Sequence, residues 1–165
     1  MKISDSVAAA INTQINNELT SSYLYLSMSA WFETQPYPGF AQWMLKQSEE
    51  ERVHAMKFFG YLNDRGGVVS LEAIAQPQPT FSKPLEAFKL ALQSEEKTTN
   101  QIHHIYEVAD EAKDYETRHF LSWFLQEQVE EEKTASDWVQ KLTLAGEHVN
   151  ALFNLDHDAA TRQDI

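Results

Sequence analysis

Glycine and proline are scarce in this chain and fall almost entirely at three places. The chain has 165 residues with 5 Gly and 5 Pro, and the breaks lie at 36–39, 66–84 and 146. The long segments between the breaks repeat apolar side chains at steps of three and four, the period of an amphipathic helix. We therefore predict helices over about 5–34, 38–66, 83–112 and 115–145, and a short fifth helix over about 147–155.

The lengths of the connections set the topology of these helices. The first and second helices, and the third and fourth, are joined by only a few residues, so each pair forms an antiparallel hairpin. Residues 67–82 contain Pro77 and Pro79 and show no helical period. Extended at about 3.3 Å per residue, they can run the length of a 30-residue helix, about 45 Å. The sequence predicts one all-α domain over 1–165, a four-helix bundle with one long crossover and a short C-terminal helix.

Composition excludes several functional classes. Lys plus Arg number 13 against 25 Asp plus Glu, for a formal net charge of -12, so the basic surface typical of nucleic-acid binding is not expected. There are no cysteines, which excludes thiolate metal sites and a cysteine nucleophile. No apolar run follows Lys2 as in a signal peptide, and no window approaches the roughly 18 apolar residues of a membrane span. We expect a cytoplasmic protein without nucleic-acid or membrane partners.

A glutamate interrupts the apolar stripe of each predicted long helix. These are Glu18, Glu51, Glu95 and Glu131, each near the middle of its helix and so at one level of the bundle. One stripe glutamate alone is more often a solvated surface residue, but four at one level would repel each other, and burial of an unpaired carboxylate costs several kcal/mol. The stripes carry no Lys or Arg. Two divalent cations would balance the four carboxylates.

The spacing of Glu51 and His54 supports a metal site. Residues three apart lie on one face of a helix, so a carboxylate oxygen and an imidazole nitrogen can reach the same ion. With single glutamates on the first and third helices, this Glu-x-x-His matches the pattern of di-iron carboxylate bundles. A donor set of oxygens with one nitrogen and no sulfur suits Fe(II), and Mn(II) or Zn(II) are alternative occupants.

These residues carry a family resemblance that extends over essentially the whole chain. The matching stretches are Asn17-Glu18-Leu19, Ser22-Tyr23-Leu24-Tyr25-Leu26, Ser48 to Ala55, Glu95 and Glu127 to Glu132. The chain resembles the non-haem bacterial ferritins. The resemblance implies a ferritin-like bundle, oxidation of Fe(II) by O2 or peroxide at a dinuclear ferroxidase centre within the subunit, and storage of ferric mineral in a homo-oligomeric shell of 24 subunits.

The resemblance also implies roles for individual residues. Site A would be Glu18, Glu51 and His54, and site B would be Glu51, Glu95 and Glu131, with Glu51 bridging and Gln128 close by as an outer or occasional ligand. Tyr25 matches a tyrosine beside the centre that can donate an electron, although a core tyrosine hydrogen-bonded to a glutamate explains it equally well.

The resemblance also implies a third iron site, on the side of the subunit that faces the interior of the shell. Glu50, Glu127 and Glu130 match this site C, although charge alone would make them a solvated acidic face. Trp123 lies near the level of the ligands and is expected to serve in packing.

Departures from related families refine the expectation. Gln128-x-x-Glu131 stands where bacterioferritins carry a second Glu-x-x-His, so site B lacks a nitrogen ligand and should bind iron more weakly. Arg52 stands where a bacterioferritin has its haem-binding Met, so no haem is expected. The segment 117–121 lacks the acidic pair that lines the iron channel of animal ferritins, which leaves the route of iron open.

Two other functions remain alternatives. The metal pair could be a fixed cofactor for oxidation of another substrate, or the bundle could be a metal-free interaction protein. Assembly is expected because several apolar residues lie off the stripes and would leave more apolar surface exposed than is usual for a monomer: Trp31, Trp43, Phe59, Leu152, Phe153 and Leu155.

Overall fold

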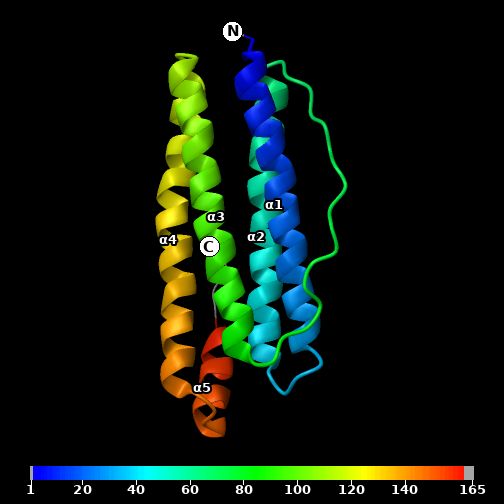
Figure 1. Cartoon of the computed structure of the whole chain (residues 1–165), viewed down its shortest axis with the longest axis vertical. Coiled ribbons are helices and arrows are strands. Elements are labelled where there is room, and N and C mark those ends of the chain that lie inside the picture. Colours follow the sequence, from blue (N-terminus) through cyan, green and yellow to red (C-terminus); the bar gives the residue numbers. More distant parts are fainter. Residues whose placement is uncertain (1, 162–165) are drawn as a thin grey trace.

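The computed structural model describes residues 2–161 and contains five helices. They are α1 (Asp5–Phe32), α2 (Pro38–Asp64), α3 (Pro84–Glu111), α4 (Tyr115–Ala145) and α5 (Val149–Ala160). Figure 1 shows the first four side by side along one axis, with α5 at one end of the bundle. The all-α four-helix bundle with a short C-terminal helix, predicted from the sequence, is confirmed.

The long crossover between α2 and α3 runs along α1 as an extended chain (Figure 1). Two asparagines, one helical turn apart on α1, hold it. The amide of Asn12 donates to the Val68 carbonyl and accepts from the Ser70 N–H, both at 2.8 Å. Asn16 repeats this with the Ser70 carbonyl and the Glu72 N–H, at 2.9 and 2.8 Å. These side chains replace the partner strand that an extended segment otherwise needs.

The interior consists of two apolar clusters at different heights. The cluster at the α5 end includes Phe32, Phe40, Trp43, Phe88 and Trp138. The cluster at the opposite end includes Ile11, Ile15, Phe58, Leu62, Ile102 and Phe124. On each of the four long helices, the stripe glutamate falls between the residues given to one cluster and those given to the other. The predicted carboxylate level therefore divides the core in two.

The fifth helix begins and ends later than the predicted 147–155. It reaches Ala160 because its polar-looking end is anchored: the Asp156 carboxylate, only 7% exposed, accepts a hydrogen bond from the Phe40 N–H at 2.8 Å. Asp156 thereby caps α2, whose own N-cap residue, Tyr37, makes no side-chain cap bond. A Cβ at Gly39 would lie 1.8 Å from the Asp156 carbonyl oxygen, so only glycine permits this approach.

The expected exposure of the off-stripe apolar residues is largely wrong. Trp31, Trp43 and Leu152 are 9%, 3% and 9% exposed, because they belong to the aromatic cluster that α5 helps to close. Phe59 and Leu155 are half-buried, and Phe153 is 46% exposed. Other apolar side chains lie at the surface instead: Val68, Leu71, Tyr115, Val129 and Leu144.

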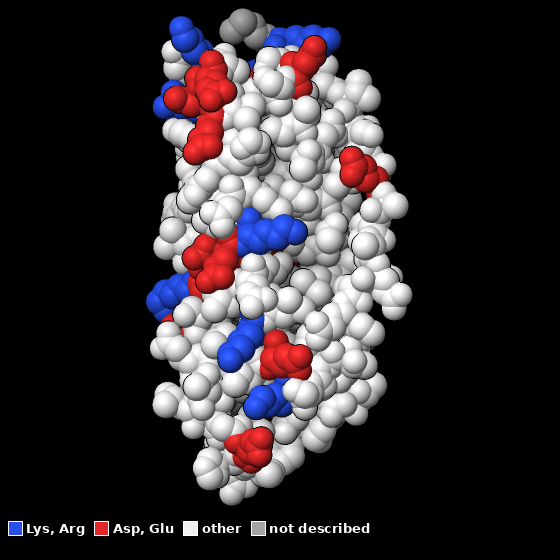
Figure 2. Space-filling view, viewed as in Figure 1, with Lys and Arg blue, Asp and Glu red and all other residues white. Residues whose placement is uncertain are grey.

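The charged side chains on one face of the molecule are mixed in sign (Figure 2). Figure 2 shows acidic and basic side chains interspersed along one face, without a continuous basic area. None of the helices in the described part of the chain combines the length and hydropathy needed to cross a membrane.

Candidate metal centre

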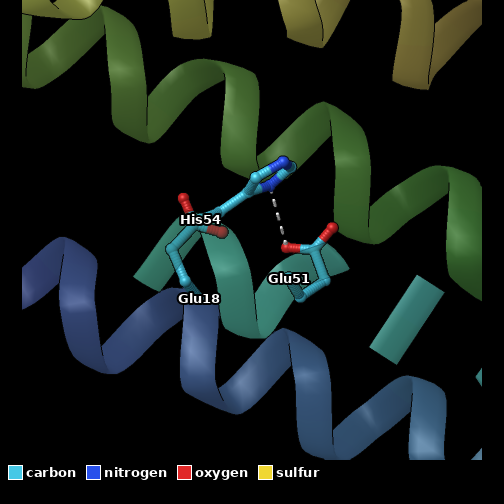
Figure 3. Close-up of side chains that lie close together, drawn as sticks. All are labelled: Glu18, Glu51 and His54. Carbon is cyan, nitrogen blue, oxygen red and sulfur yellow. Dashed lines mark ion pairs between the residues drawn. The ribbon is translucent and has the colours of Figure 1, made fainter. Parts of the chain in front are cut away.

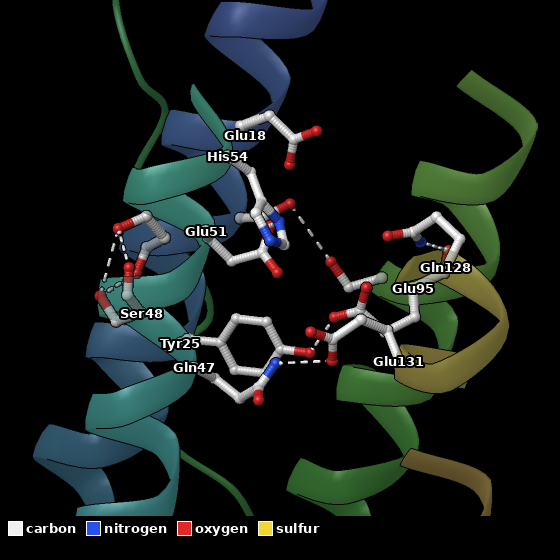
Figure 4. A network of polar contacts seen from close by, with 12 residues as sticks. Glu18, Tyr25, Gln47, Ser48, Glu51, His54, Glu95, Gln128 and Glu131 are labelled. Carbon is white, nitrogen blue, oxygen red and sulfur yellow. Dashed lines mark hydrogen bonds and ion pairs between the residues drawn. The ribbon is translucent and has the colours of Figure 1, made fainter. Parts of the chain in front are cut away.

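Six polar side chains from four helices meet at the level between the two apolar clusters (Figure 4). They are Glu18 on α1, Glu51 and His54 on α2, Glu95 on α3, and Gln128 and Glu131 on α4, and each is between 1% and 7% exposed. Each glutamate lies near the middle of a long helix, and the helix carries buried apolar residues of one cluster on one side of it and of the other cluster on the other side. Packing of the stripes therefore brings all four carboxylates inside.

Glu18, Glu51 and His54 form one compact group. One ligand atom from each lies within 4.8 Å of the others, and His54 Nδ1 is 3.9 Å from Glu51 Oε2. Figure 3 shows Glu18 from α1 and the α2 pair pointing toward one another. Two carboxylates and an imidazole at this spacing can surround one divalent ion.

A second group of possible ligands consists of His54, Glu127 and Glu131, again within 4.8 Å. Glu127, assigned from the sequence to site C, thus also reaches the two inner residues. Glu127 and Glu131 are four apart on α4 and so share a face, a signal that the sequence contains. Burial raises the pKa of Glu127, and the nearby charges of Glu130 and Glu50 raise it further.

The hydrogen bonds of the inner carboxylates come from neutral donors. Gln14 Nε2 donates to Glu18 Oε1 at 2.8 Å, and Gln47 Nε2 donates to Glu131 Oε2 at 3.1 Å. The Tyr25 hydroxyl donates to Glu95 Oε1 (Figure 4). Gln128 instead turns its amide nitrogen to α3, where it donates to the Glu95 carbonyl at 3.2 Å and to Thr99 Oγ1 at 3.3 Å.

Several carboxylate oxygens have no hydrogen-bond partner although they are buried. Among the described residues these are Glu18 Oε2, Glu95 Oε2 and both oxygens of Glu51. An unsatisfied buried polar group costs about 1–3 kcal/mol, and more when it is charged. Oxygens that face one another in this way fit divalent cations, which would satisfy them all at once.

The pKa values of the metal-free centre also suit the binding of divalent cations. Burial and the charges of Glu95 and Glu18 raise the pKa of Glu51 well above its usual range, and burial also raises the pKa of Glu18. Burial and the charge of Glu131 raise the pKa of Glu95 to about 8. Burial and Lys57 lower the pKa of His54 to about 4, so its imidazole is neutral at pH 7 and can donate a lone pair to a metal.

A model of the family described as "Ferritin-like domain" matches residues 8–145. The chain belongs to the ferritin family. A bacterial non-heme ferritin of Staphylococcus aureus (strain MRSA252) is 38% identical over 97% of this chain and 96% of its own length, and that of Staphylococcus epidermidis is 39% identical over the same shares.

A solved open pore ferritin from the hyperthermophilic archaeon Archaeoglobus fulgidus has a TM-score of 0.96 to this chain at 44% identity, covering 98% of both chains. A ferritin of the same species engineered into a closed form has a TM-score of 0.97 at 43% identity, covering 99% of this chain and 100% of that one.

Two aromatic residues flank the centre of this ferritin. Tyr25 is fully buried, and its pKa is raised by burial and by the charges of Glu95 and Glu51, so its hydroxyl keeps its proton and acts as a donor. Trp123 packs edge-on against His54 at 5.4 Å between ring centroids, with the Lys57 ammonium 3.8 Å from the Trp123 ring centroid. Packing fixes the orientation of the imidazole, as expected for Trp123.

The structure adds two residues to those singled out from the sequence. Gln14 and Gln47 are 1% and 0% exposed, and each donates to a candidate ligand. Gln14 lies four residues before Glu18, and Gln47 four before Glu51, so each occupies the turn preceding a ligand on the same helix face.

Proposed function

We propose that this ferritin oxidises Fe(II) at a dinuclear centre within each subunit and stores the product as ferric mineral. Family membership supports iron storage, and Glu18, Glu51 and His54 could bind the metal. The observation that carries the proposal is the set of buried carboxylate oxygens without partners, which a purely structural bundle would gain nothing from keeping.

The proposed ligands divide between two iron positions. Site A consists of Glu18, Glu51 and His54, and site B of Glu51, Glu95 and Glu131, with Glu51 bridging. Both unpartnered oxygens of Glu51 support its bridging role. Site B has only oxygen ligands, because α4 supplies Glu131 in place of the histidine of a second Glu-x-x-His, so it should hold iron more weakly and release the oxidised ion to the store.

Oxidation at this centre needs electrons, protons and a place for new charge. Each Fe(II) gives up one electron, so a pair of ions supplies the two electrons that reduce O2, with two protons, to peroxide, or that reduce peroxide, with two protons, to water. Binding of iron displaces the protons that the raised pKa values keep on Glu51 and Glu95. The carboxylates then stabilise the higher charge of Fe(III).

A third iron site and assembly into a shell complete the proposed function. Glu50, Glu127 and Glu130 would form a third iron site, supported by the effect that the charges of Glu130 and Glu50 have on the pKa of Glu127. The subunits would form a shell of 24 around the mineral, supported by the apolar side chains left at the surface. The expected location is the cytoplasm, and no haem is expected.

Aerobic loading with Fe(II), followed by iron analysis of the purified protein, tests the function. Storage predicts hundreds of irons per chain, a fixed metal cofactor predicts about two, and a metal-free bundle predicts none. Sedimentation in iron-free buffer tests the shell, which monomers or dimers alone would contradict.

A further inference from the structure

The carboxylates of Glu18, Glu95 and Glu131 are held differently from that of Glu51. Glu18, Glu95 and Glu131 each accept a hydrogen bond from a neutral side chain, namely Gln14, Tyr25 and Gln47. Within the described chain, no amide or hydroxyl donor reaches either oxygen of Glu51, whose nearest carboxyl neighbour is Glu18. The donors therefore distinguish three carboxylates at the edge of the centre from the one in the middle.

This distribution determines how each carboxylate can bind metal. A carboxylate whose first oxygen accepts a hydrogen bond presents its second oxygen, and Glu18 and Glu95 each have one such buried, unpartnered oxygen. A bridge between two ions needs both oxygens, and Glu51 keeps both. Because the donors are amides and a phenol, they orient the ligands without placing a positive charge beside the site where the cations would bind.

We propose that Gln14 and Gln47 are positioning residues of the metal centre: through single amide hydrogen bonds they fix Glu18 and Glu131 as ligands through one oxygen each. The inference rests on the proposed dinuclear centre. Outer partners of this kind commonly orient metal ligands and tune their affinity.

Burial of Gln47 argues against a packing role alone. The side chain is 0% exposed, and its Oε1 has no hydrogen-bond partner within the described chain. An unsatisfied buried amide oxygen is unfavourable by about 1–3 kcal/mol, which Met or Leu of similar volume would avoid. The bond from Nε2 to Glu131 is the feature that those residues could not reproduce.

Gln14 is held from its other side. Its Oε1 accepts a hydrogen bond from Asn17 Nδ2 at 3.3 Å, which sets the direction of the Nε2 group toward Glu18. Gln14 also lines a groove of about 640 Å³ between α1 and α3, together with Gln101 and other polar residues. A replacement must therefore keep the volume of Gln14, or solvent from the groove would reach Glu18.

Gln14→Met and Gln47→Met keep the volume and remove the donor. We would titrate the full, metal-free protein with Co2+ and follow its visible absorption, which reports the coordination of each ion. Wild type should bind two ions per chain at the dinuclear centre, besides any ion held by Glu50, Glu127 and Glu130. Gln14→Met should weaken the ion at Glu18 and His54 by about 10–100-fold, and Gln47→Met the ion at Glu131 by a similar factor, each with a changed spectrum for that ion alone.

Gln101→Met is the matched control, because Gln101 lines the same groove and donates to none of the described site carboxylates. It should leave both ions unchanged. Unchanged affinity and spectrum in both test variants, with or without a lower melting temperature, would overturn the assignment. Equal weakening of both ions by either variant would also overturn it, since that indicates a general loss of structure. Each variant tests the assignment alone if the other fails to fold. A wild-type protein that bound no Co2+ would overturn the dinuclear centre itself.

Discussion

The apolar clusters and the carboxylate level between them use the same stripes of the same four helices. In the clusters, neighbouring side chains satisfy one another: Phe40, Trp43, Phe88 and Trp138 pack with ring centroids 5.2 to 6.1 Å apart. At the carboxylate level, buried oxygens face one another without partners. The clusters therefore stabilise the bundle by themselves, whereas the level between them holds buried oxygens that divalent cations could satisfy.

The sharpest difference should appear at Glu51. Replacement by Ala removes the only proposed ligand shared by both irons, so rapid Fe(II) oxidation should fall to the rate of iron without protein. Stopped-flow absorbance after mixing with Fe(II) in air measures this rate. Glu49→Ala, which removes an exposed carboxylate two residues away, should retain the fast phase. Fast oxidation in Glu51→Ala would contradict the bridge.

Glu95→Ala or Glu131→Ala should chiefly empty site B.

A substitution in an apolar cluster should affect stability and leave metal binding intact. Phe88 is fully buried in the cluster at the α5 end. Phe88→Ala should lower the free energy of unfolding by about 3–5 kcal/mol, because it removes a large apolar side chain and leaves a cavity. The folded variant should still bind two Co2+ per chain. Denaturant unfolding of the metal-free protein measures the loss, and exposed Lys89→Ala should differ from wild type by no more than about 0.5 kcal/mol. Loss of metal binding at full folding would show that the two regions are not independent.

The stability of the metal-free protein should depend on pH through the carboxylate level and not through the apolar clusters. Glu95 has a folded pKa of about 8 against a usual value of 4.5, because burial and Glu131 disfavour its charge. A raised carboxyl pKa contributes stability below pH 4.5, and that contribution is lost as the pH rises through about 8.

The metal-free protein should therefore melt at a lower temperature at pH 9 than at pH 6, by an amount on the order of 5 °C. Differential scanning calorimetry across this range measures the slope. Glu95→Gln should flatten it, and saturation with Zn2+ should do the same, because the metal replaces the protons. An equal slope in wild type and Glu95→Gln would show that Glu95 is not the group that titrates.

The two regions also differ in how far sequence predicts them. The helical period predicts which residues face the interior and at what height along the bundle. It therefore predicted that Glu18, Glu51, Glu95 and Glu131 are buried at one level. Gln14 lies off the apolar stripe, and its donor role depends on a rotamer that only packing determines. The end of α5 was missed for a similar reason, because Asp156 looks solvent-exposed until it caps the distant α2.

The smallest expected effect concerns the outer acidic residues, where the carboxylate level meets solvent. Glu130 is exposed, unlike the inner ligands. Its charge and that of Glu50 raise the pKa of Glu127. Glu130→Ala should leave the first, fast oxidation unchanged, but it should alter later turnovers or the ratio of iron oxidised to O2 consumed, because a third iron would lose a ligand. An oxygen electrode with sequential Fe(II) additions measures that ratio. Glu116→Ala removes the same charge from an exposed position at the start of α4 and serves as the control. If the outer residues are only an acidic surface, the two variants should behave alike, and both effects should shrink at high salt. An effect of Glu130→Ala that persists at high salt and is absent in Glu116→Ala would extend the metal-dependent level outward to the surface of α4.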